Sequence, residues 1–170
     1  MYYQKFIDFL KRHNLYNEEV LTYWKNNKMS FDYREEEQRE LIGVYYIFKK
    51  NILEKIQLIV PFTDNDKTVL INIHEYIHLF LLYPYINKRC IIDKDKEVLP
   101  FYYERLYIEE NNTEELKKYY QYLNSCIIKD NIDEYTIALE ISDILLSEYR
   151  NNDIKRLQKH TKKLMKKMKK

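Results

Sequence analysis

The chain contains at residues 69–82 the run that decides how it folds, Val69-Leu70-Ile71-Asn72-Ile73-His74-Glu75-Tyr76-Ile77-His78-Leu79-Phe80-Leu81-Leu82. The run holds neither glycine nor proline and is too long for an ordinary strand, so it predicts a helix over roughly residues 66–82. Because this helix is apolar nearly all round, it should be buried. An imidazole or carboxylate in a buried helix costs free energy unless it has a partner, so the two histidines and the glutamate need one.

Within this run, His74-Glu75-Tyr76-Ile77-His78 fits the pattern HExxH. Positions i and i+4 of a helix lie about 40° apart, so both imidazoles project from one face. Two neutral imidazoles so placed can share one tetrahedral zinc ion, with Glu75 turned toward the same pocket. Chance produces the pattern in on the order of one sequence in a hundred, and a lone histidine in such a helix is more often a packed core residue. Two histidines with a glutamate between them favour a metal site.

Composition excludes several classes of function. The chain has 170 residues and a single glycine, Gly43. Phosphate-binding loops and dinucleotide folds need several glycines for close backbone approach, so both classes are excluded. The two cysteines, Cys90 and Cys126, lie far apart in no metal or redox motif, which favours the reducing cytoplasm. The charged N-terminus is not a signal peptide, and no apolar run is long enough to cross a bilayer.

The remaining sequence predicts a mainly α (α+β) fold, with a small antiparallel β element before the HExxH helix. Apolar residues at helical spacing predict two N-terminal helices, the second capped by Asn17, and Ser30 or Asp32 could cap a third that ends at Gly43. Residues 44–48 and 52–60 resemble a hairpin that Pro61 stops. Thr63 or Asp64 is the expected cap of the HExxH helix.

Four further helices are expected after it. Pro100 suits the first turn of a helix to about residue 110, and Asn112 with Glu115 forms a possible capping box for another over roughly 113–128. Asp133 opens a long helix through residue 150, and a basic helix covers 153–168. We expect one domain over residues 1–150 and a basic C-terminal tail at 151–170.

A catalytic zinc ion usually has three protein ligands and one open position for water. Eighteen residues separate His78 from Glu97, and Glu104 follows seven residues later, on the same face if the helix reaches back to Glu97. Because Pro100 limits how far back that helix runs, Glu104 also stays a candidate. We favour Glu97 over Glu104. Three more residues could supply the third ligand in their place, namely Asp93, Asp95 and His160.

His74-Glu75-Tyr76-Ile77-His78 followed by the stretch 97–104, EVLPFYYE, resembles the zinc sites of gluzincin-type metallopeptidases, and within them the thimet-oligopeptidase-like families. The resemblance covers roughly residues 66–110. It implies that Glu97 binds zinc and that Glu104 supports the site. The chain differs from these families in carrying Ile77 where a glycine is common, and it is far shorter. It would therefore be either a reduced catalytic core or a relative that has lost activity.

If the site is complete, a peptide or protein is the expected substrate. Zinc would activate a water molecule and polarise the scissile carbonyl, and Glu75 would act as general base. A donor to the developing oxyanion is still needed. Tyr135 is our first candidate, followed by Tyr102, Tyr103 and Tyr107, although each tyrosine is more often a packing residue. The hairpin could present an edge strand to an extended peptide, or could only cover the metal helix.

The net charge of +2 conceals a basic C-terminal tail. Residues 151–170 hold nine Lys or Arg residues against Asp153, a net charge of +8, so the remaining 150 residues sum to −6. A basic amphipathic helix can contact an anionic membrane surface or nucleic-acid phosphates. The simpler interpretation is a last helix whose apolar stripe packs on the body. The tail has no aromatic residues to stack on bases, so no specific nucleic-acid binding is expected. Two alternatives to a peptidase remain open. The protein could be a non-catalytic zinc-binding interaction protein, or it could bind a membrane surface or a nucleic acid through its basic tail.

Overall fold

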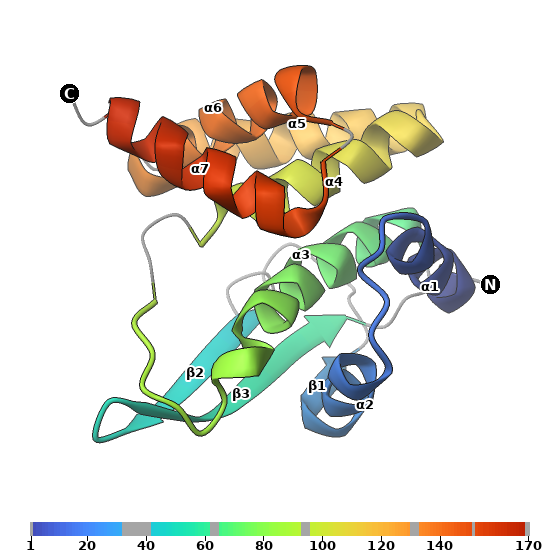
Figure 1. Cartoon of the computed structure of the whole chain (residues 1–170). Coiled ribbons are helices and arrows are strands. Elements are labelled where there is room, and N and C mark those ends of the chain that lie inside the picture. The colour runs from blue at the N-terminus through green and yellow to red at the C-terminus, as the bar shows by residue number, and fades with distance from the viewer. Residues whose placement is uncertain are drawn as a thin grey trace. The chain divides into compact units, whose positions relative to one another are not determined.

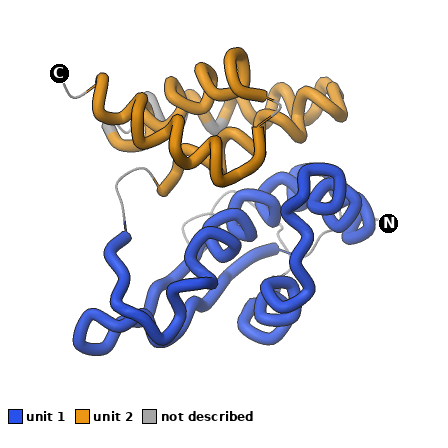
Figure 2. Tube along the Cα trace, viewed as in Figure 1, with its two compact units in different colours: residues 1–92 blue, residues 93–170 orange. Residues whose placement is uncertain are grey.

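The computed structural model describes residues 2–31, 42–61, 65–92, 96–129, 133–150 and 152–168. Seven α-helices and a three-stranded sheet make up the described residues, which confirms the mainly α (α+β) fold. The chain forms two compact units, residues 1–92 and 93–170 (Figure 2). The prediction of a single domain over residues 1–150 stays a prediction, and each unit is described by itself.

The first unit begins with two helices, α1 (Tyr2–Arg12) and α2 (Glu18–Asn27) (Figure 1). Asn17 caps α2 as predicted, because its side-chain oxygen accepts a hydrogen bond of 3.1 Å from the backbone N–H of Val20. The apolar stripes of both helices are buried, and Trp24 is fully enclosed. The apolar residues at helical spacing in the N-terminal sequence therefore form part of the core of this unit.

A mixed sheet follows, with strands β1 (Lys28–Phe31), β2 (Gly43–Lys49) and β3 (Ile52–Pro61) in the order β1-β3-β2. The antiparallel pairing of β2 with β3 confirms the predicted hairpin. The parallel pairing of β1 with β3 was not predicted. Ser30 lies in β1, so the expectation that it caps a helix is wrong. The third predicted helix and its other cap, Asp32, fall on residues outside the described ones.

Helix α3 (Asp66–Leu82) has the predicted bounds and packs on β2 and β3 (Figure 1). Its cap is Asn65, which accepts from the backbone N–H of Thr68 at 2.9 Å, while the Thr68 hydroxyl accepts from the backbone N–H of Asn65 at 3.2 Å. This reciprocal box stands in place of the caps expected at Thr63 or Asp64, two residues that lie outside the described ones. A short 3₁₀ helix, η2 (Tyr83–Tyr85), follows directly.

Four helices make up the described part of the second unit, namely α4 (Val98–Asn111), α5 (Glu114–Lys129), α6 (Asp133–Glu148) and α7 (Ile154–Met168). Helix α4 packs on α6, and α7 packs on both. The capping box expected from Asn112 and Glu115 is wrong. Asn112 instead ends α4 in the left-handed conformation, with φ 49°, and the Thr113 hydroxyl accepts from the backbone N–H of Leu116 to cap α5.

None of the helices in the described ranges is both long and apolar enough to cross a membrane.

Candidate metal centre

Helix α3 brings His74 and His78 together on one of its faces. Their Nε2 atoms lie 3.2 Å apart, and their ring centroids are 5.0 Å apart. Two nitrogens bound tetrahedrally to one zinc ion at ordinary bond lengths stand about 3.3–3.4 Å apart. The observed separation is therefore close to what a shared metal ion requires, and both ligands come from one rigid helix.

Glu75 lies between the two histidines in sequence and is buried, with 8% of its surface exposed. His78 is buried too, while His74 is half-buried. A carboxylate is stable in such surroundings only with a charged or hydrogen-bonded partner. Glu75 is thus a buried carboxylate in the apolar helix, directly after the first of the two histidines.

Two polar side chains fix the orientation of α3, and neither was recognised from the sequence. The side-chain amide of Asn72 donates to the carbonyl oxygens of Pro61, at 3.2 Å, and Thr68, at 2.7 Å. The Tyr76 hydroxyl donates to the carbonyl oxygen of Leu15 at 3.1 Å. Burial raises the pKa of Tyr76, so the phenol stays protonated and keeps donating. The only sign of these contacts in the sequence is a polar group inside an apolar helix, and that sign does not identify the hydrogen-bond partner.

Aromatic packing holds the same side of α3. The Tyr76 ring meets Phe6 edge-on at 5.6 Å between centroids, and Trp24 at 5.7 Å. Such edge-to-face pairs add to the free energy gained from burial alone. Tyr76 is therefore a positioning residue within the HExxH pentapeptide, and its neighbours in α1 and α2 limit rotation of the helix that carries both histidines.

Glu97 is the N-cap residue of α4 and is also buried, with 7% of its surface exposed. Its Oε1 atom is 3.9 Å from the Lys96 ammonium nitrogen, the distance of a weak ion pair. Among the described residues, His74, His78 and Glu97 form a group that could hold a metal ion. Two imidazoles and one carboxylate are a donor set that zinc accepts, with a fourth position left for water or substrate.

Glu104 lies seven residues further along α4 and is buried, but it is not part of that group. Burial raises the pKa of Tyr120, the Arg105 guanidinium opposes this shift, and the Glu104 carboxylate adds to it. His160, on α7, stacks on Tyr149 with 3.9 Å between ring centroids and is also outside the group. Asp93 and Asp95, which the sequence also allowed as ligands, fall outside the described residues.

The candidate oxyanion donors all lie in the second unit, where Tyr102, Tyr103 and Tyr107 are buried and Tyr135 is half-buried. Tyr135 meets Phe101 edge-on at 6.0 Å. The Tyr102 hydroxyl donates to the carbonyl oxygen of Arg150 at 2.9 Å, and burial raises its pKa to about 12. Tyr103 and Tyr107 are almost fully buried. These contacts are those of packing residues, and a catalytic role for Tyr135 stays a prediction.

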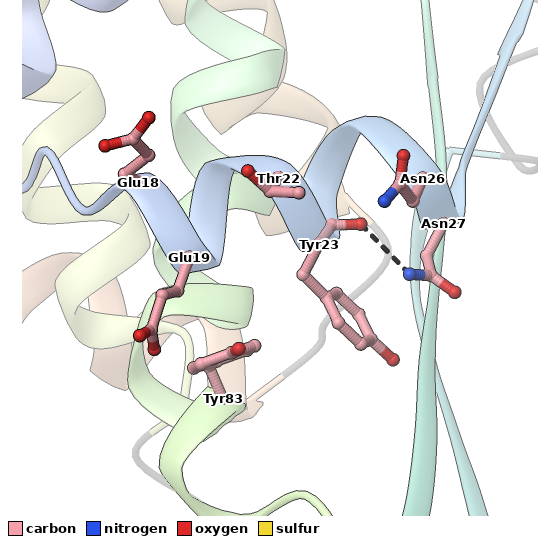
Figure 3. A pocket seen from close by; sticks show the side chains of 7 residues that line it. All are labelled: Glu18, Glu19, Thr22, Tyr23, Asn26, Asn27 and Tyr83. Atoms are coloured by element: carbon pink, nitrogen blue, oxygen red, sulfur yellow. Dashed lines mark hydrogen bonds between the residues drawn. The ribbon is translucent and has the colours of Figure 1, made fainter.

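A shallow recess on the first unit, about 490 Å³ in volume, contains none of the predicted site residues. One face of α2 and the ring of Tyr83 line it (Figure 3). In its wall, the Tyr23 hydroxyl donates to the carbonyl oxygen of Ile56 and accepts from the Ile56 backbone N–H, and the Tyr23 ring meets Tyr83 edge-on at 5.6 Å. The acidic residues at its rim, Glu18 and Glu19, occupy the first turn of α2, where the helix dipole favours them.

Comparisons of the chain with models of known protein families, with curated protein sequences and with solved structures gave no match.

Proposed function

We propose that the protein is a zinc-dependent metallopeptidase whose metal is held by His74, His78 and Glu97. The observation that carries the proposal is the 3.2 Å separation of the two histidine Nε2 atoms, which matches two corners of a zinc tetrahedron. The group formed with Glu97 supplies the carboxylate expected from the sequence. Bound zinc would supply Lewis acidity, which activates water and polarises a carbonyl group.

Glu75 has the role of general base in this proposal. Its carboxylate takes a proton from the attacking water and then gives that proton to the leaving amine as the peptide bond breaks. The presence of a buried carboxylate directly after the first histidine supports the assignment. A purely structural metal site would need no base at this position. Glu104 would act as a supporting carboxylate on α4, and Tyr135 stays our candidate donor to the oxyanion.

The substrate would be an extended peptide or a peptide segment of a protein. Within the described residues, strand β2 pairs only with β3, so its other edge could take up a further strand. Tyr45 and Ile47 on β2 are exposed and could contact substrate side chains. The cysteine usage supports action in the cytoplasm.

The first test is the zinc content of the tag-free protein after dialysis, measured by elemental analysis. We expect about one equivalent per chain in the wild type. His74→Ala and His78→Ala should each lose it, and His160→Ala should retain it as a matched control. A folded wild-type protein that takes up no zinc even when zinc is added would refute the metal site.

The second test is hydrolysis of a peptide library by the zinc-loaded protein, with Glu75→Gln as the comparison. Glu75→Gln should bind zinc as the wild type does and lose hydrolysis by at least about 100-fold, because the amide cannot accept the proton. Zinc binding without hydrolysis in either protein would favour the alternative, a non-catalytic zinc-binding interaction protein. Full hydrolysis by Glu75→Gln would refute the mechanism.

A further inference from the structure

Helix α7 carries a row of lysines that the proposed peptidase does not use. Six of them form what we call the basic face, namely Lys155, Lys159, Lys162, Lys163, Lys166 and Lys167. All six are exposed. At 100° per residue they fall within an arc of about 140°, and they extend along roughly 18 Å of the helix. No acidic residue lies between the two ends of α7.

The other side of α7 is occupied by its own unit. Leu157 and Thr161 are buried, and the helix packs on α6 and α4. The Thr161 hydroxyl donates to the carbonyl oxygen of Leu157 at 2.9 Å, so its polar group is satisfied within the helix. Of the other apolar residues on α7, Ile154, Leu164 and Met165 are half-buried and Met168 is exposed. The simpler interpretation, an apolar stripe packed on the body, therefore stays a prediction. Turning the side of α7 that carries Leu157 outward would break the packing of this unit.

Helix α7 is also anchored at its start. Asp153 accepts from the backbone N–H of Arg156 at 3.0 Å, and its carboxylate lies 3.6 Å from the guanidinium of the same residue. The cap stabilises the first turn of α7, and the packing of the helix on α6 and α4 holds its lysines in a row on the exposed side. Each lysine stem is long enough to carry its ammonium group to a flat surface.

We propose that the basic face of α7 docks the protein on the surface of a lipid bilayer that contains anionic headgroups. Such a surface attracts a row of lysines without inserting the helix, which suits a helix whose Leu157 is already packed inside its unit. The partly exposed Met168 at the end of α7 could contact the headgroup boundary beside the last lysines.

The composition of the basic face favours a membrane over a nucleic acid. Recognition of nucleic acids commonly uses arginine, which pairs with phosphate through two hydrogen bonds, and aromatic side chains that stack on bases. The basic face has neither, since Arg156 is paired with Asp153. Lysines alone act as point charges and suit a diffuse layer of anionic headgroups.

Cosedimentation with vesicles tests the proposal on the full chain. The probes are phosphatidylcholine vesicles and vesicles in which about one third of the lipid is phosphatidylserine. We expect binding to the anionic vesicles only, and loss of binding at high salt. Replacing Lys159, Lys163 and Lys166 with Gln should lower partitioning roughly 100-fold, because each lysine near the surface contributes about fivefold.

The matched control replaces the exposed Lys25, Lys55 and Lys118 with Gln, which changes the net charge equally but leaves α7 intact. It should bind as the wild type does. Equal loss in both triple variants would overturn the proposal by showing attraction to overall charge alone. Absence of binding to anionic vesicles, or tighter binding to a short RNA duplex in the same buffer, would also overturn it. None of these outcomes depends on zinc or hydrolysis.

Discussion

The side-chain amide of Asn72 in α3 donates a hydrogen bond of 3.2 Å to the carbonyl oxygen of Pro61, the last residue of β3. The same amide donates to the Thr68 carbonyl one turn earlier in the helix. Asn72 therefore links the sheet to the helix two residues before His74. Because both groups are buried, this link sets how far α3 is rotated about its axis, and with it the direction of both imidazoles.

Replacing Asn72 with Leu should destabilise the protein. The substitution leaves the Pro61 carbonyl without its side-chain donor, at a cost of about 2 kcal/mol in the free energy of unfolding. Thermal denaturation should show a melting temperature roughly 4–8 °C lower. Asn26→Leu on the exposed face of α2 serves as the control and should leave it within about 1 °C. An unchanged melting temperature in Asn72→Leu would show that the link contributes nothing.

The hairpin turn offers a substitution in the stabilising direction. Lys50 and Asn51 have φ values of 49° and 64°, the two positive angles of a type I′ turn. Lysine is disfavoured in this conformation, whereas Asn-Gly is the pair that type I′ turns prefer. Changing Lys50 to Asn and Asn51 to Gly should raise the free energy of unfolding by about 0.5–1 kcal/mol, measured by urea denaturation. As a control, Lys55→Asn inside β3 should lower the free energy of unfolding, because Asn is disfavoured in strands.

Much of the first unit could be predicted because its signals are local. Helix α3 comes from one nearly continuous apolar run, and the β2–β3 hairpin from two apolar-rich segments that Pro61 stops, so their predicted bounds agree closely with the structure. Strand β1 could not be predicted, because a polar and apolar alternation over only four residues directly after a helix is too short to identify a strand. It is held by parallel pairing with β3, about thirty residues away. That pairing depends on tertiary structure, and the local sequence around β1 gives no information about it.

The candidate site divides in the same way. His74, Glu75 and His78 follow from spacing on one helix, because a helix fixes the geometry of residues four apart. Asn72 and Tyr76 could not be assigned in advance, since their partners are the carbonyl oxygens of Pro61 and Leu15. Those two contacts join residues 11 and 61 positions apart, and only the folded chain identifies them.

Alkaline pH should destabilise the protein through its buried tyrosines. Burial raises the pKa of Tyr102 from 10.0 to about 12, and it also raises that of Tyr76, Tyr103 and Tyr120. A raised pKa in the folded state contributes stability that is complete below the unfolded pKa and is lost as pH rises through the folded pKa. The free energy of unfolding should therefore fall above pH 10.

Ultraviolet absorbance of tyrosinate, followed together with circular dichroism, measures this effect. The buried tyrosines should ionise only as helical structure is lost. Tyr102→Phe should reduce the pH dependence between pH 10 and 12 by up to about 1.4 kcal/mol per pH unit, because one linked proton is removed. Substituting the exposed Tyr45 with Phe should not reduce it. Complete ionisation before any unfolding would contradict the prediction.

The roles of Glu97 and Glu104 can be separated by zinc affinity. Glu97→Gln removes a charged ligand in the proposed site, so competition with a chelator should show affinity at least about 100-fold lower. Glu104→Gln removes only a supporting carboxylate and should cost roughly 10-fold. Glu148→Gln, on an exposed position of α6, should have no effect. If Glu104→Gln lowers the affinity more than Glu97→Gln does, Glu104 is the third ligand and the assignment of Glu97 is wrong.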